Sequence, residues 1–188
     1  MAHGFKPGDR VTVTRTYLEM SERPSGPRAP SPNLKGLALI RAEDPPRRWF
    51  LHLYDSVGSS YEWCDWHERP AEQLEAFIGD KDVSIFTLML QGWTAGFFML
   101  DWREAGVAEI AYFGLTPAAV GRGLSRWMLD TAIHTGWDRD GVRKLTINTC
   151  TLDHPRAIAL YQRAGFAPVE RESFERVLVN ELSQEAAP

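Results

Sequence analysis

Val-Ala-Glu-Ile-Ala-Tyr-Phe-Gly-Leu-Thr-Pro-Ala-Ala-Val-Gly-Arg-Gly-Leu spans Val107–Leu124. Its first half, Val107–Leu115, is apolar and rich in β-formers, which is typical of a buried strand. The strand pattern stops at Thr116-Pro117, and Gly121-Arg122-Gly123 leads into Leu124–Trp137, where apolar residues recur at helical spacing. The stretch therefore predicts a strand, a glycine turn and a helix in succession.

A glycine turn that opens a helix is an anion-binding arrangement. Glycine lets the backbone approach a phosphate closely, and the first helical N–H groups and the helix dipole point at it. The stretch lacks the lysine of a Walker A loop and the GxGxxG order of dinucleotide folds. A GxG turn is also a common plain helix start, so the anion site remains one of two interpretations.

Composition limits the class of protein. The chain has 188 residues, 44% of them hydrophobic, and a net charge of −4, which suits one domain over residues 1–188 with a substantial core. Mixed charge and the lack of a long apolar run argue against nucleic acid and membrane partners. Cys64 and Cys150 make neither a disulfide framework nor a metal set. We expect a cytoplasmic protein.

Outside the opening stretch, hydrophobic patterns outline the remaining elements. Strands are predicted at Val11–Tyr17, Val83–Leu90, Trp93–Leu100, Lys144–Thr151 and Ser173–Asn180, and Leu34–Arg41 is apolar. Helices are predicted at Trp49–Val57, Pro70–Ile78 and Arg156–Ala164. Proline-rich Glu22–Asn33 is expected to be a loop, Gly96 to mark a close approach or bulge, and Glu181–Pro188 to be a frayed tail.

Two segments resemble the GNAT family of N-acetyltransferases. Its core motif, (Arg/Gln)-x-x-Gly-x-(Gly/Ala), grips the pyrophosphate of acetyl-CoA, and Gly121 and Gly123 match it, although Ala118 stands where Arg or Gln is expected. Ala157–Phe166 resembles the family's closing helix, with His154 in place of its Asn. The resemblance is strong over residues 83–179.

The resemblance implies an α/β (α+β) GNAT fold, with a mixed central sheet, two parallel strands that splay apart, and helices on both faces. It implies acetyl-CoA as co-substrate and no metal. The acetyl-CoA core would span about residues 83–179, and an acceptor-side insert about 18–80. The residues implied to bind the cofactor are Leu115, Val120, Gly121, Arg122, Gly123, Leu124, Ser125 and His154.

Two residues are implied to be catalytic. Tyr161 matches the family's tyrosine, the candidate acid for the departing thiolate; by periodicity alone it is an ordinary core tyrosine. Glu109 is a charged residue in an apolar strand, and Ala108-Glu109-Ile110 resembles the histone acetyltransferase branch, whose Glu is the general base; a solvated strand position is the alternative. A backbone N–H near Leu115, where the family's strand bulges, would polarise the thioester.

Aromatic residues crowd the segment Ser59–Glu68. Tyr61, Trp63 and Trp66, beside Glu62, Asp65 and His67, form a candidate site for an amine-bearing acceptor, recognised by ring faces and carboxylates. The alternative is that the aromatic rings simply cover the core.

The sequence therefore predicts transfer of an acetyl group from acetyl-CoA to a primary amine by direct attack. The acceptor, a small molecule or a peptide, and a homodimer stay open. A non-catalytic acyl-CoA-binding or regulatory module on the same fold competes, favoured by Ala118 and His154. A Cys150–His154 nucleophile pair is a weaker alternative, because no third group orients it.

Overall fold

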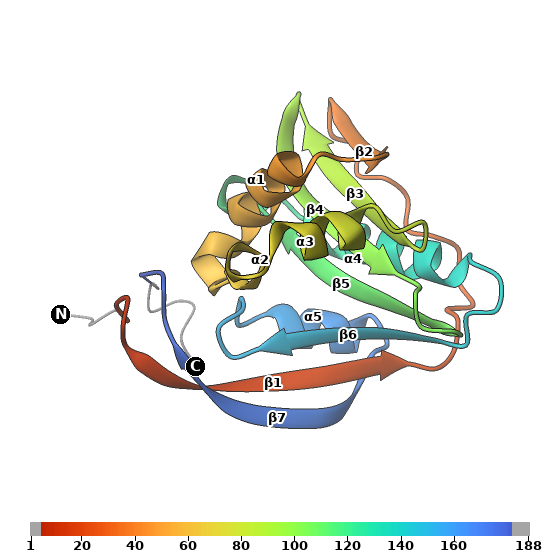
Figure 1. Ribbon diagram of the computed structural model, residues 1–188. Coiled ribbons are helices and arrows are strands. Elements are labelled where there is room, and N and C mark those ends of the chain that lie inside the picture. The colour runs from red at the N-terminus through yellow and green to blue at the C-terminus, as the bar shows by residue number, and fades with distance from the viewer. Residues whose placement is uncertain (1–4, 182–188) are drawn as a thin grey trace.

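The computed structural model describes residues 5–181 and contains a seven-stranded sheet with helices on both faces (Figure 1). The strands are β1 (Arg10–Met20), β2 (Leu37–Ala42), β3 (Val83–Leu90), β4 (Trp93–Asp101), β5 (Val107–Leu115), β6 (Lys144–Cys150) and β7 (Ala167–Val177). The helices are α1 (Arg47–Gly58), α2 (Asp65–Glu68), α3 (Ala71–Ile78), α4 (Leu124–Trp137) and α5 (Ala157–Arg163). Short 3-10 turns lie at η1 (Ser59–Tyr61) and η2 (Pro117–Ala119).

The strand order is β2-β3-β4-β5-β6-β1-β7. All neighbouring pairs are antiparallel except β5 and β6, which α4 connects as a parallel pair. Their pairing runs only from Val107 opposite Lys144 to Ile110 opposite Ile147, and the strands then part. The predicted mixed sheet with a splayed parallel pair is confirmed.

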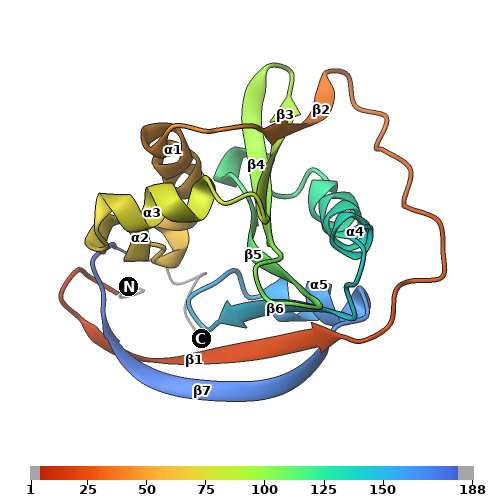
Figure 2. The ribbon, with the colours of Figure 1, turned by 45° about the vertical axis from the view of Figure 1, so that its right-hand side comes forward.

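The strands β3, β4 and β5 are covered on both faces (Figure 2). Figure 2 shows α1, α2 and α3 on one side of β3, β4 and β5, and α4 on the other. Adjacent residues of β4 serve the two layers, since Phe97 packs with α1 and α3 whereas Phe98 packs in the cluster of α4. This follows from the alternation of side chains along a strand, and it explains why β4 is apolar throughout.

Gly96 shows why one strand position must be glycine. A Cβ there would lie 2.4 Å from the carbonyl oxygen of Gly114 in β5. The register of β3 and β4 also shifts beside it, because Leu88 faces Gly96 and Met89 faces Thr94. The predicted close approach and the predicted bulge therefore both occur in this part of β4.

The predicted bounds of the last strand, Ser173–Asn180, were wrong. β7 begins at Ala167 and ends at Val177, and nearly all its residues are exposed, so no alternation of buried and exposed residues marks its first half. After it, Leu178 is still hydrogen-bonded to the chain just before β1: it donates its N–H to Asp9 O (2.9 Å) and accepts the N–H of Gly8 (2.8 Å). Of the predicted tail, residues 182–188 lie outside the described part of the chain.

The proline-rich loop is ordered against α4. Residues 21–36 have no regular secondary structure, as predicted for Glu22–Asn33, and they pass outside α4 (Figure 2). Arg23 and Arg28 pair with Asp138, just beyond the helix, and Ala29 donates its N–H to Asp130 Oδ2 (2.7 Å). The loop thereby carries the chain from β1, on one half of the sheet, to β2 on the far edge.

Candidate active site

A cleft of about 1080 Å³ lies where β5 and β6 part. It reaches both layers, because Tyr161 of α5 and Ser125 of α4 line it from one side and Trp63 and Phe77 from the other. β1 and β7 contribute further wall residues, which are Val13, Arg15, Phe174 and Arg176. Most residues singled out in the sequence meet at this cleft.

The start of α4 offers free backbone donors to the cleft. Gly121 and Gly123 have φ of +82° and +74°, a left-handed conformation that favours glycine, and a Cβ at either would meet nothing within 4 Å. Within residues 5–181, the N–H groups of Gly121, Gly123, Leu124 and Ser125 have no acceptor. No acidic side chain occupies the first turn of this 14-residue helix. The turn therefore suits an anionic group.

The predicted cofactor residues divide into two groups. Six of them line the cleft: Leu115, Val120, Gly121, Gly123, Ser125 and His154. Leu124 is fully buried in the core and offers only its backbone. Arg122 lies off the cleft wall, because its Nε donates to Ala118 O (2.9 Å) and its guanidinium lies 5.7 Å from the centre of the Trp93 ring.

The ring of His154 makes a hydrogen bond that the sequence did not predict. Its Nδ1 accepts the N–H of Arg156 (3.1 Å), and its carbonyl accepts the N–H of Ala157 (2.8 Å). The ring thus shapes the entry to α5.

Tyr161 is buried, with 5% of its surface exposed, yet it lines the cleft. Its ring meets Phe113 and Phe166 edge to face, at 6.1 and 6.5 Å between centres. Among the described residues its hydroxyl has no hydrogen-bond partner. Burial, aided by the charge of Asp153, raises the pKa of Tyr161, so the hydroxyl keeps its proton at neutral pH.

Asp153 is a cleft residue that sequence reasoning missed. Its Oδ2 accepts hydrogen bonds from Thr149 Oγ1 and Cys150 N–H (both 2.8 Å), and its Oδ1 accepts one from Trp63 Nε1 (3.2 Å). It therefore ties the aromatic segment to the end of β6. Its neighbour His154 was singled out in the sequence, as a cofactor residue implied by the resemblance and as the suggested partner of Cys150.

The aromatic segment, Ser59–Glu68, contributes both to the hydrophobic core and to the wall of the cleft. Trp66 is 6% exposed, donates its Nε1–H to Tyr112 Oη (2.7 Å) and stacks on Phe77 at 5.2 Å. Tyr61 and Trp63 are half-buried, and the Tyr61 ring lies 6.4 Å from that of His154. All three predicted acceptor residues, Tyr61, Trp63 and Trp66, line the cleft.

The polar residues beside these rings already have partners. The buried Glu62 carboxylate accepts the N–H groups of Val179 and Asn180. Asp65 pairs with Arg176 (3.1 Å), and His67 pairs with Asp55 (2.6 Å). These contacts fasten the segment to the end of β7 and to α1, which leaves the rings as its main surface toward an acceptor.

Glu109 lies just before the two strands part. It is half-buried in β5, opposite Asp101 of β4 and Thr146 of β6, and it lines the cleft. Burial first, and the Asp101 carboxylate second, raise its pKa above the usual range of a glutamate. A group of this kind is suited to accept a proton near neutral pH.

The irregularity of β5 lies nearer Glu109 than predicted. We expected a bulge near Leu115, but the register with β4 shifts at Ala111, because Met99 faces Tyr112 and Leu100 faces Ile110. The extra residue bends β5 at the point where its pairing with β6 ends. The edge of β5 beyond Ile110 therefore faces the cleft without a strand beside it.

The alternative of a cysteine nucleophile finds no support. Burial raises the pKa of Cys150 to about 11, which keeps the thiol protonated at neutral pH. The Nδ1 of its suggested partner, His154, is engaged by a backbone N–H.

Comparison with protein families identifies the class of this protein. The model of the acetyltransferase (GNAT) family matches residues 37–166, so the chain belongs to the GNAT family. The match runs from β2 to α5 and ends at residue 166. It excludes β1 and β7.

Solved structures share the fold at low identity. A GCN5-related N-acetyltransferase from Sphaerobacter thermophilus has a TM-score of 0.60 and 16% identity, over 99% of this chain and 56% of that one. One from Kribbella flavida has a TM-score of 0.57 and 16% identity, over 88% and 58%. An aminoglycoside acetyltransferase from an uncultured soil metagenomic sample has a TM-score of 0.53 and 16% identity, over 69% and 90%. The chain thus spans less than two thirds of the length of the first two.

A comparison with curated proteins found no match. Over residues 5–181, no helix is long and apolar enough to cross a membrane. The same residues contain no group of three or more His, Cys, Asp or Glu side chains that could hold a metal ion.

The state of Cys150 can be tested by alkylation. In a Cys64→Ser variant, the reaction of Cys150 with iodoacetamide should be slow at pH 7.5 and should accelerate toward pH 11, because burial disfavours the thiolate. The measurement is the alkylation rate as a function of pH. A rate that is already at its plateau near neutral pH would revive the nucleophile hypothesis.

Proposed function

We propose that the protein transfers an acetyl group from acetyl-CoA to a primary amine by direct attack. The observation that carries the proposal is that two features share one cleft: free N–H groups at the start of α4, and the Tyr161 hydroxyl, which has no hydrogen-bond partner among residues 5–181. The first suits a phosphate, and the second suits a leaving group that needs a proton.

The residues present fit acetyl-CoA. The N–H groups of Gly121, Gly123, Leu124 and Ser125 would hold its pyrophosphate, and the free edge of β5 would pair with its amide-bearing arm. Of the other residues singled out, Val120, Leu115 and His154 would flank the group, whereas Arg122 would add charge from outside the cleft wall. Acetyl-CoA supplies the acetyl group as an activated thioester.

The chain's own groups would then move the protons. Glu109 would take a proton from the acceptor ammonium, since its raised pKa brings its basicity closer to neutral pH. N–H groups of β5 past the bulge at Ala111 would polarise the carbonyl. Tyr161, which is protonated at neutral pH, would supply a proton to the departing sulfur.

The acceptor side is the least determined part of the proposal. Tyr61, Trp63 and Trp66 would form one wall, and polyamines, amino acids, aminoglycosides and protein N-termini are all eligible acceptors. The sequence composition leads us to propose a cytoplasmic location as well. We propose neither a nucleic acid nor a membrane as partner, and a homodimer is one option.

A screen of amines tests the proposal as a whole. The protein is incubated with acetyl-CoA and one amine from each acceptor class, and free thiol is followed against controls without protein and without amine. Thiol release that depends on both protein and an amine supports the enzyme. Binding of acetyl-CoA, seen as a thermal shift, without release for any amine would favour a non-catalytic acyl-CoA-binding module instead.

Gly123→Val tests the cofactor loop. It should weaken acetyl-CoA binding at least about tenfold, because valine hinders the left-handed backbone and covers the N–H groups. Gly141→Val is a matched control, since Gly141 has φ of +83° and equally open space but lies off the cleft. Calorimetric titration of both folded variants gives the comparison. Wild-type affinity in folded Gly123→Val would remove the cofactor from this loop.

Tyr161→Phe tests the acid. It should lower kcat about a hundredfold, at the lower end of the effect of general acids, since a thiolate can also depart unprotonated. Acetyl-CoA affinity and Tm should change little, because the hydroxyl has no hydrogen bond to lose among the described residues. Steady-state thiol release and a melting curve measure both. Normal turnover, with chemistry shown to limit the rate, would exclude Tyr161 from catalysis.

A further inference from the structure

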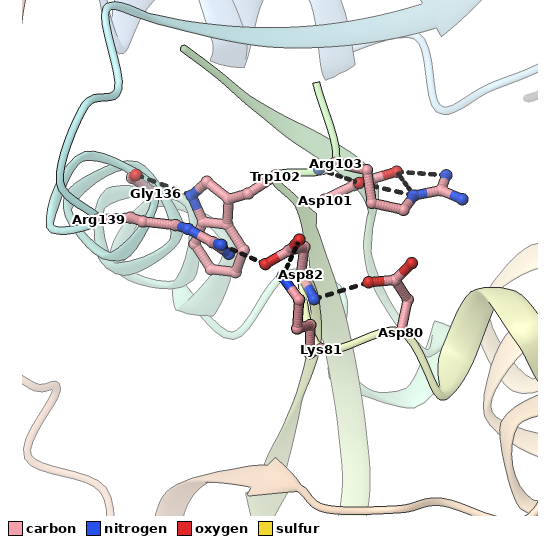
Figure 3. A network of polar contacts seen from close by, with 8 residues as sticks. All are labelled: Asp80, Lys81, Asp82, Asp101, Trp102, Arg103, Gly136 and Arg139. Carbon is pink, nitrogen blue, oxygen red and sulfur yellow. Dashed lines mark hydrogen bonds and ion pairs between the residues drawn. The ribbon is translucent and has the colours of Figure 1, made fainter. Parts of the chain in front are cut away.

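Two charged residues beside Glu109 are bound to each other. In Figure 3, the Arg103 guanidinium grips the Asp101 carboxylate through two nitrogens: Nε lies 3.0 and 3.1 Å from the two oxygens, and Nη2 lies 2.7 Å from Oδ2. The N–H of Arg103 also donates to Asp101 Oδ1 (2.9 Å). Such a two-pronged pair fixes the direction of the guanidinium as well as its distance.

The surroundings hold this pair in place. Only 10% of the Asp101 side chain is exposed, and the Arg103 guanidinium lies 4.5 Å from the centre of the Phe77 ring. Between the two residues, Trp102 donates its Nε1–H to Gly136 O (3.1 Å) at the end of α4, as Figure 3 shows. The two residues that follow β4 are therefore anchored to different helices, Trp102 to α4 and Arg103 to α3.

Glu109 lies directly across from this pair. Asp101 of β4 and Glu109 of β5 are opposite each other in the ladder. Asp101, Arg103 and Glu109 line the main cleft together, and they also line a smaller cavity of about 380 Å³ with Glu104, Val107 and Thr146. The charge of Arg103 reaches Glu109, whose pKa it lowers in opposition to burial and Asp101.

The other elements around Glu109 do not supply a competing cation. β6 presents uncharged Thr146, and Lys144 two residues earlier is bound to Glu19 (2.6 Å). The turn before β5 contributes Glu104, a further negative charge, while Asp80 from the end of α3 acts on Arg103. Arg103 is therefore the cation whose position matters most for Glu109.

We propose that Asp101 is a positioning residue for the base: it holds the Arg103 guanidinium to itself and so keeps it from forming an ion pair with Glu109. This inference rests on the proposed function, in which Glu109 accepts the proton of the acceptor. An ion pair with arginine would occupy the carboxylate and weaken it as a base. The carboxylate of Asp101, by contrast, repels charge on Glu109 and favours its protonation.

Two substitutions should shift the pKa of Glu109 in opposite directions. Asp101→Asn removes the repelling charge and frees Arg103, so the pKa of Glu109 should fall by at least about half a unit. Arg103→Gln removes the attracting charge and leaves Asp101 unpaired, so the pKa should rise by a similar amount. The acid limb of the pH–rate profile should follow, moving to lower pH in Asp101→Asn and to higher pH in Arg103→Gln.

Arg139→Gln is the matched control. Arg139 belongs to the same polar network, where it pairs with Asp82 and lies 5.3 Å from the centre of the Trp102 ring (Figure 3). Its loss should disturb the turns between these strands to a comparable degree without touching Glu109. A purely structural role for Asp101 and Arg103 predicts that all three variants lower Tm and leave the pKa of Glu109 in place.

Carbon-13 NMR of the glutamate carboxyl groups measures that pKa without any acceptor. The Glu109 signal is assigned by its loss in Glu109→Gln and is titrated in the wild type and in each variant. Opposite shifts in Asp101→Asn and Arg103→Gln, with none in Arg139→Gln, support the inference, and an unmoved pKa in both variants overturns it. If the pKa moves while the rate profile does not, Asp101 still tunes Glu109, and the proposed role of Glu109 as the base fails instead.

Discussion

The parting of β5 and β6 after four paired residues is the constraint on which the site depends. The two strands pair from Val107 to Ile110, and no further strand fills the gap beyond. Backbone groups that a sheet would normally satisfy are left at the edge of a cleft, where unpaired polar groups are costly. A ligand with amides of its own is suited to satisfy them. The bulge at Ala111 coincides with the end of this pairing.

The position of each candidate catalytic group follows from that parting. Glu109 is the last charged residue of β5 before the gap, and it remains between two strands, where burial keeps its pKa high. Tyr161 enters from α5, in the layer of α4, on the other side of the sheet from α1–α3. The proposed proton acceptor and the proposed proton donor therefore line one cleft from different elements of the fold.

The N-terminal strand completes the cleft from outside the family match. β1 precedes residue 37, where that match begins, yet it lies between β6 and β7 in the sheet. It brings Val13 and Arg15 to the cleft wall, and β7 brings Phe174 and Arg176. Arg176 binds Asp65, and Glu62 binds backbone N–H groups just after β7, so this half of the sheet also holds the aromatic segment. This wall of the cleft is thus assembled from distant parts of the chain.

Local sequence signals predicted what depends on neighbours along the chain. The apolar run of β5, the glycine turn and the spacing of α4 were sufficient to predict the strand, turn and helix that meet at the cleft, whereas Tyr161 was singled out only by the family resemblance. The bonds of Asp153 to Trp63, and of Asp101 to Arg103 opposite Glu109, depend on strand register and on packing between layers, which periodicity does not report. Arg122 is the opposite case. The local motif predicted that Arg122 would contact the anion, but its side chain contacts Trp93 and Ala118 instead. The exposed first half of β7 lacked any pattern to detect.

Amide hydrogen exchange with and without acetyl-CoA tests most directly whether the parted strands form the cofactor site. The account predicts that acetyl-CoA slows exchange at the free N–H groups of Gly121, Gly123, Leu124 and Ser125 and along the cleft edge of β5 from residue 111 to 115, while the edge strand β2 stays unchanged. Saturating acetyl-CoA that leaves both regions unprotected, or that protects a different part of the chain, would contradict it.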